Sequence, residues 1–352
     1  MNRYAVSGLV KQDINNRVRG HIMGLNDFSV EKPTIICLGG DQTFRDSLIK
    51  DLCDTVGRII GLGVQGPREI ASYNDIDIVG IYYGQDKETD KTFCLSEEDR
   101  DDIVNHILLP LCVDEEGKLL PLEQICKNFS LLNFFTHCHG AFELYKITAK
   151  LHKILLDKGL TNEQAHEVYA HSFHCSYAAN HRESFYPTMY IYSLTDGCYI
   201  NLWWEYEDTY REKLDGVSVK YNPPGKFMTE NISSRNYNDH VHHDSIIVFS
   251  SRLVNPPPEN GKYFKHIYDE HSYRFLDRCS KNWRSAGVDS VYTPNADLVS
   301  QMAAYAMAVN ITASLHTYRT NKLTKRMPIL DLKTELESLI ESFRKEDLQL
   351  HK

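Results

Sequence analysis

The residue types best suited to covalent chemistry meet in the run Thr136–Gly140, which reads THCHG. A cysteine thiolate is a strong nucleophile, and an imidazole close to it can take up the thiol proton. An apolar stretch over 131–135 comes before this run, and a long helical pattern over 141–156 comes after it. A nucleophile on a sharp turn between a strand and a helix stands at the tip of that turn. We therefore predict that Cys138 is the nucleophile of an enzyme.

The flanks of this turn match only part of the motif G-x-S-x-G, in which the backbones of strand and helix pass very close to each other. Gly140 supplies the second small residue, and Cys138 takes the place of the serine. Thr136 replaces the first glycine and brings a branched side chain into a crowded position. The turn thus departs from the motif at two positions.

Strand, turn and helix together resemble the nucleophile elbow of the α/β-hydrolases, and the order of motifs extends the resemblance over residues 33 to 275. The resemblance implies a mainly parallel central sheet with helices on both faces. It also implies a hydrolase or acyltransferase, without a cofactor, that acts on an ester, a thioester or an amide. The expected partner is then a small-molecule or acylated substrate.

The same resemblance assigns an oxyanion hole. In that fold, one N–H comes from a loop after an earlier strand, and the other comes from the residue after the nucleophile. Here Gly39-Gly40-Asp41 follows a strand predicted at 34–38, and His139 follows Cys138. The donors would be the backbone N–H of His139 and that of Gly40 or Asp41.

The acid and the base should follow later strands. Asp196 comes just after a predicted strand at 188–193, and His271 comes after the last predicted strand, at 245–250. His271 would take the thiol proton and later return it to the leaving group, while Asp196 would orient the imidazole. The chain thus carries the order Cys, Asp, His that the fold requires.

A second hypothesis rests on His139 and Glu143, which lie about one helical turn apart and so share a helix face. Such an H-x-x-x-E pair also resembles the motif of bacterial effector domains that use Ser, His and Glu, some of which transfer AMP. Ser96 and Ser72 are candidates for the upstream serine. In a purely structural reading, Glu143 stabilises the start of the helix.

A third hypothesis is an inactive hydrolase-like module that binds a protein partner through an insertion at 198–244. Each proposed site residue also has a structural reading. Cys138 would be a buried thiol, Asp196 a turn residue before glycine, His271 a surface histidine, and Gly39-Gly40 a tight exit from a strand.

A metal site is the remaining alternative at this turn. Thiolate and imidazole are good zinc ligands, but neighbouring side chains on a sharp turn point in different directions. We therefore predict no metal there; the candidate ligands were His137, Cys138, His139, His171, His174 and Cys175. The group His240, His242 and His243 is interpreted as a polar loop.

Composition sets the broad class. The 352 residues are 42% hydrophobic and carry a formal net charge of -9, which argues against a nucleic-acid-binding surface. Nine cysteines, an odd number without a C-x-x-C pair, suggest a reducing compartment, and we expect a cytoplasmic protein. The N-terminus lacks the pattern of a signal peptide, which does not speak against export by another route. No apolar run approaches the ~18 residues that span a bilayer.

The remaining pattern predicts a single α/β domain over 1–352. The region 198–244 would be an irregular insertion that caps the sheet, and 324–352 a C-terminal amphipathic helix. Further predicted strands cover 76–83, 131–135 and 167–173. Further predicted helices cover 43–60, 103–109, 122–128, 141–156, 296–317 and 330–343.

Overall fold

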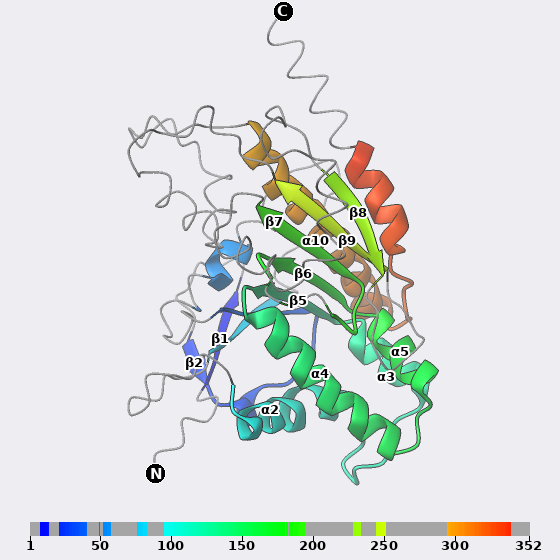
Figure 1. The fold of residues 1–352 in the computed structure, drawn as a ribbon. Coiled ribbons are helices and arrows are strands. Elements are labelled where there is room, and N and C mark those ends of the chain that lie inside the picture. Colours follow the sequence, from blue (N-terminus) through cyan, green and yellow to red (C-terminus); the bar gives the residue numbers. More distant parts are fainter. Residues whose placement is uncertain are drawn as a thin grey trace, which may run out of the picture.

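One nine-stranded sheet organises the computed structural model, in the order β2-β1-β4-β3-β5-β6-β7-β9-β8 (Figure 1). The structure describes residues 8–13, 21–40, 49, 52–57, 76–82, 95–179, 181, 183–193, 228–233, 244–250 and 294–338. The strands are β1 (Gly8–Asp13), β2 (His21–Met23), β3 (Thr34–Leu38), β4 (Asp77–Tyr82), β5 (Leu132–His137), β6 (Phe173–Tyr177), β7 (Thr188–Ser193), β8 (Met228–Ser233) and β9 (Asp244–Ser250). The pairings from β4 through β3, β5, β6 and β7 to β9 are parallel, whereas β1, β2 and β8 add antiparallel edges. The predicted α/β class with a mainly parallel sheet is confirmed.

The central strands are buried on both faces. Every residue of β3 and of β5 is buried, as expected for strands covered on both sides. Successive side chains of β5 point to opposite faces, so Phe134 and Phe135 belong to two separate hydrophobic cores. The sheet is therefore the shared wall between two cores.

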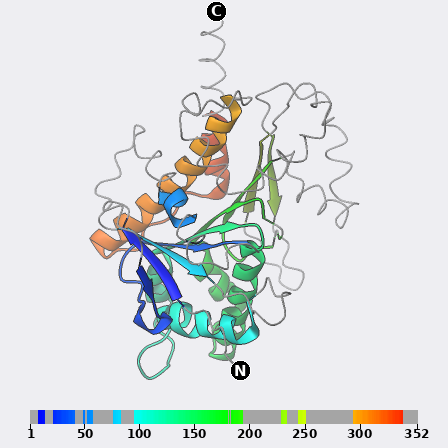
Figure 2. The ribbon, with the colours of Figure 1, turned by 90° about the vertical axis from the view of Figure 1, so that its left-hand side faces the viewer.

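Helices cover both faces of this sheet (Figure 2). On one face lie α2 (Glu97–Ile103), α3 (Leu122–Phe129), α4 (Gly140–Asp157) and α5 (Asn162–Ala170), which form one core with Phe134. On the other face, α10 (Pro294–Thr320) and the helical residues 52–57 and 329–338 form the second core with Phe135. No helix in the described ranges is long and apolar enough to cross a membrane.

Most sequence boundaries lie close to the observed ones, but three predictions were wrong. Residues 167–173 were predicted to be a strand, yet Asn162–Ala170 is the helix α5. The side chains of Thr161 and Gln164 form a reciprocal capping box at its start, which satisfies two backbone N–H groups and favours a helix. The strand begins only at Phe173.

The other two errors concern 198–244 and the helix predicted at 103–109. The first region is not wholly irregular, because β8 lies within it and pairs antiparallel with β9. The helix begins earlier, at Glu97, because Ser96 caps it, and it passes through a π-helical turn before Pro110. The sequence also gave no signal for β1 and β2. Most of the predicted insertion lies outside the described residues.

A buried arginine holds the amino ends of β5 and β6. The Arg326 guanidinium donates hydrogen bonds to oxygens of the strands and of α10, none of which carries a charge. Burial lowers the pKa of Arg326 to about 9, so the group stays protonated at neutral pH. The acceptors belong to Ser130, Leu132, Asn133, His171, Asn310 and Ser314.

The first turn of α4 touches the end of β3. A Cβ added at Gly140 would lie 2.9 Å from the carbonyl oxygen of Gly39 and closer still to that of Leu38. Such backbone contacts cannot move aside as a side chain can. A glycine is therefore required where α4 passes β3.

We predict that Gly140→Ala destabilises the fold by at least about 2 kcal/mol, because the added methyl group forces α4 away from β3. Gly57→Ala is the matched control, since its Cβ would meet only Ile78 at 3.4 Å. Urea unfolding of both variants measures the difference. Equal stabilities would show that the contact between α4 and β3 is not tight.

Candidate active site

Cys138 stands between β5 and α4 with a left-handed backbone, φ 52°. A left-handed residue with a Cβ costs roughly 1–2 kcal/mol, and such strain gathers at functional sites. The backbone N–H of Cys138 still donates to the carbonyl oxygen of Tyr177, at 3.1 Å, so the residue remains attached to the sheet. Its side chain is half-buried. The sharp strand–turn–helix geometry predicted for this residue is present.

Gly40, at the end of β3, lies directly against this cysteine. A Cβ added at Gly40 would come to 2.6 Å from the Cβ of Cys138 and 3.2 Å from its Sγ. The structure therefore brings Gly40 close to the sulfur, and the role of its N–H as an oxyanion donor stays a prediction. Asp41, the alternative oxyanion donor, lies outside the described residues.

Thr136 occupies the place of the first glycine because polar groups surround its hydroxyl. Its Oγ1 lies 2.7 Å from Nε2 of His174 and 2.7 Å from the hydroxyl of Ser176. Nδ1 of His174 lies 3.2 Å from the hydroxyl of Thr188 on β7. The branched residue thus starts a buried polar network that joins β5, β6 and β7.

The sheet separates two of the side chains that were considered as metal ligands at this turn. His174 is hydrogen-bonded within the network, whereas Cys175 points into the core on the other face of the sheet. Among the described residues, His137, Cys138, His139, His174 and Cys175 form no group of three donor atoms within 4.8 Å of one another, and His171 belongs to a different group.

His139 and Glu143 contact each other across one turn of α4, with Nε2 of His139 at 3.2 Å from Oε1 of Glu143. Glu143 is fully buried and accepts further hydrogen bonds at both oxygens. Arg100 of α2 donates to it through Nε at 2.9 Å and through a terminal nitrogen at 3.1 Å, and the Leu95 N–H donates at 3.2 Å. The carboxylate therefore joins the starts of α2 and α4 and orients the imidazole.

The charge of Glu143 is stabilised by these partners. Burial alone would raise its pKa, but the hydrogen bonds and charges of His139 and Arg100 outweigh burial and lower it. Glu143 is thus a buried carboxylate whose negative charge is stabilised by His139 and Arg100. Ser96, a serine considered for the second hypothesis, caps α2 by accepting from the N–H of Asp99; Ser72 lies outside the described residues.

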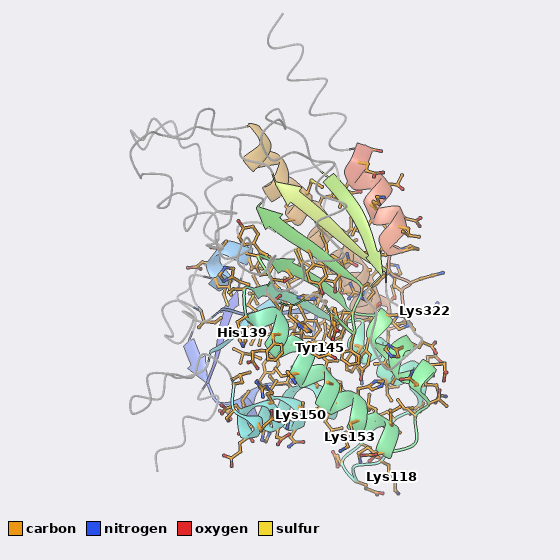
Figure 3. The ribbon with its side chains drawn as sticks, viewed as in Figure 1. Lys118, His139, Tyr145, Lys150, Lys153 and Lys322 are labelled. Atoms are coloured by element: carbon orange, nitrogen blue, oxygen red, sulfur yellow. The ribbon has the colours of Figure 1, made fainter. Side chains whose placement is uncertain are left out.

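Aromatic rings lie along α4 beside the turn, and the sequence analysis did not anticipate them. The ring of Phe142 lies 5.1 Å from that of His139 and 5.4 Å from that of His181. Tyr145 follows His139 along the same helix (Figure 3), and its ring lies 4.6 Å from that of His181. His181 follows β6 by a few residues, and no spacing in the sequence connects it with α4.

A second strained residue lies beside the first. Ala178 follows β6 directly, as Cys138 follows β5, and it too is left-handed, with φ 51°. Its N–H donates to the carbonyl oxygen of Ile191 on β7 at 2.8 Å. Two strained, non-glycine residues therefore stand side by side at the carboxyl edge of the sheet.

The structure thus brings together Cys138, Gly40, His139 and Glu143. The predicted acid Asp196 and the predicted base His271 lie outside the described residues, as do His240, His242 and His243. Among the described residues, no side chain hydrogen-bonds to the Sγ of Cys138. No family model and no curated protein matches the sequence.

We expect Glu143→Gln to destabilise the protein by about 3–5 kcal/mol, because it removes the buried charged partner of Arg100. Glu97→Gln is the control. Glu97 is an exposed second partner of Arg100, and its loss should cost about 0–1 kcal/mol. Chemical denaturation at neutral pH compares the two. A similar cost for both variants would show that the buried pair adds nothing.

The buried His174 makes stability depend on pH. Burial lowers its pKa from 6.5 to about 3, so it is neutral in the folded protein while the unfolded chain takes up a proton below pH 6.5. Stability must therefore fall with falling pH in that window, by about 1.4 kcal/mol per pH unit from this residue. Unfolding free energies at pH 7 and pH 5 should differ by about 2 kcal/mol less in His174→Gln than in the wild type. An unchanged pH slope in the variant would contradict this assignment.

Proposed function

We propose that this protein is a hydrolase or acyltransferase with an α/β-hydrolase-like site, in which Cys138 attacks the carbonyl carbon of an ester, a thioester or an amide. The observation that carries the proposal is the left-handed Cys138 between a central parallel strand and a long helix. Gly40 makes room for the Cys138 side chain, and Gly140 allows the first turn of α4 to pass the end of β3. A strained cysteine at the carboxyl edge of a parallel sheet lies where ligands bind in α/β proteins.

The thiol at this position is set apart from the other described cysteines. Cys37, Cys53, Cys112, Cys126 and Cys175 are buried, whereas Cys138 is half-buried. Burial raises the pKa of Cys112 and of Cys175 to about 12, which keeps them protonated. Cys138 instead directly precedes the first turn of α4, and its half-buried side chain is more accessible than the buried thiols.

In the proposed reaction, the thiolate sulfur bonds to the substrate carbonyl carbon, and the carbonyl oxygen becomes an oxyanion. The backbone N–H of His139 and that of Gly40 or Asp41 would stabilise this charge, at ~3 kcal/mol for each donor. Collapse of the intermediate expels the alcohol, thiol or amine, which takes a proton from the base. Water or an acceptor alcohol, thiol or amine then attacks the acyl-cysteine and releases the sulfur.

We assign the base to His271 and the acid to Asp196. The strands β7 and β9, which these residues follow in the chain, run parallel to β5. The carboxyl ends of all three strands therefore lie at the same edge of the sheet as Cys138. This arrangement supports a triad whose members come from different strand ends.

The transfer of AMP by His139 and Glu143 is the weaker proposal. Glu143 is fully buried and is held by Arg100, by the Leu95 N–H and by His139, so a nucleotide cannot reach it without breaking these bonds. An inactive module would gain nothing from strain at Cys138.

The test is thiol reactivity followed by turnover. A limiting dose of iodoacetamide near neutral pH should alkylate Cys138 first, as read by peptide mass spectrometry, because the other described cysteines are buried. His271→Ala should slow this labelling at least about tenfold, and an activated acyl ester should leave an acyl group on Cys138. Cys138→Ser should keep the fold and lose most turnover, while Cys112→Ser, the control, should keep both.

The assignment would be overturned if several cysteines were alkylated at similar rates and Cys138 were not among those that react fastest. Incorporation of label from ATP, lost in His139→Ala but kept in Cys138→Ser, would instead support nucleotidyl transfer.

A further inference from the structure

The helices α3 and α5 pack together (Figure 1), and they bring a second group of reactive side chains close to one another. Cys126 belongs to α3, Glu167 to α5, and His171 is the residue at which α5 ends. One donor atom from each of the three lies within 4.8 Å of the other two. In the described part of the chain, this is the one group of three such donors.

The three donor types suit one class of metal ion. Thiolate, imidazole and carboxylate are the usual ligands of zinc and of the divalent ions that resemble it. Bonds of about 2.0–2.3 Å around a tetrahedral ion place neighbouring donor atoms roughly 3.4–3.8 Å apart. The donors therefore need to close by at most roughly 1.4 Å, which the exposed side chain of Glu167 can do by rotation.

The placement on helices favours such a site. Glu167 and His171 are four residues apart and so project from the same face of α5, toward Cys126. Cys126 is buried and His171 is half-buried, so two of the three ligands are held by packing. Glu167 is exposed, which leaves an entry path from solvent and room for a water as a fourth ligand.

The local charges agree with this arrangement. The carboxylates of Glu167 and Glu123 both lie close enough to Cys126 to act on it electrostatically. A divalent cation would offset both carboxylates and the thiolate. The nearby Arg326, which bonds the carbonyl oxygen of His171, is a single opposing charge.

We propose that Cys126, Glu167 and His171 bind a zinc-like divalent transition-metal ion that clamps α3 to α5. The site lies at the amino ends of β5 and β6, whereas Cys138 lies at the carboxyl end of β5. The ion would therefore stabilise the fold and take no part in the chemistry at Cys138. This proposal does not depend on the proposed function.

The experiment uses the full-length protein after treatment with a chelator and titrates it with cobalt(II). We expect binding of one ion at this site, with a sulfur-to-cobalt charge-transfer absorption in the near ultraviolet. Cys126→Ser should lose that absorption, and Glu167→Gln and His171→Gln should weaken cobalt binding by at least about tenfold. Zinc should raise the melting temperature of the wild type but not of these variants, since a ligand stabilises the state that binds it.

Two further variants serve as controls. Glu163→Gln changes another exposed carboxylate of α5, and Cys112→Ser changes another buried thiol of the same core. Both should bind cobalt like the wild type. Absence of the absorption, its persistence in Cys126→Ser, or unchanged binding in Glu167→Gln would overturn the proposal. Glu167→Gln decides the matter if Cys126→Ser fails to fold, because its side chain is exposed.

Discussion

The close approach of α4 to β3 is the constraint on which the centre of this structure depends. With Gly140 against the carbonyl oxygens of Leu38 and Gly39, the chain must leave β5 and enter the helix within two residues. A turn that short requires the left-handed backbone of Cys138. The position of the half-buried sulfur therefore follows from the packing of a helix on a neighbouring strand.

The two ends of β5 are held by different forces. At the carboxyl end, backbone contacts leave no space for a side chain at Gly140. At the amino end, the buried guanidinium of Arg326 satisfies carbonyl oxygens of the chain around β5 and side chains of α10. A buried charge with only neutral acceptors costs desolvation energy, and its many hydrogen bonds offset that cost. Steric fit fixes one end and hydrogen bonding fixes the other.

The sequence predicted most accurately those elements whose conformation is determined by residues close together in the chain. The strands at 34–38 and 188–193 agree with the structure residue for residue, because a short apolar, β-branched run between turn residues has few alternatives. The turn at Cys138 was recognisable because strand, nucleophile, glycine and helix are adjacent in the chain. The helix α5 was mistaken for a strand because its start depends on a capping box that the pattern of apolar residues does not show.

Contacts between distant residues carried no comparable signal. Arg100 and Glu143 are 43 residues apart, and an arginine within an acidic helix reads as a solvated charge. The buried partners of Thr136, His174 and Ser176, lie on the neighbouring strand β6, so its hydroxyl looked misplaced in a site that calls for glycine. In both cases the tertiary fold supplies a polar partner from a distant part of the chain. The periodicity of hydrophobic residues does not predict such partners.

The two left-handed residues, Cys138 and Ala178, mark the boundary between the sheet and the chain that follows it. The N–H of Cys138 bonds to the end of β6, and that of Ala178 bonds to β7, so each strand is extended by one residue. The backbone that carries the sulfur thus belongs to the rigid ladder of the sheet. Substitutions or insertions in residues 194–227, between β7 and β8, need not move that sulfur. Substrate preference can therefore diverge among variants of this protein while the position of the cysteine is preserved.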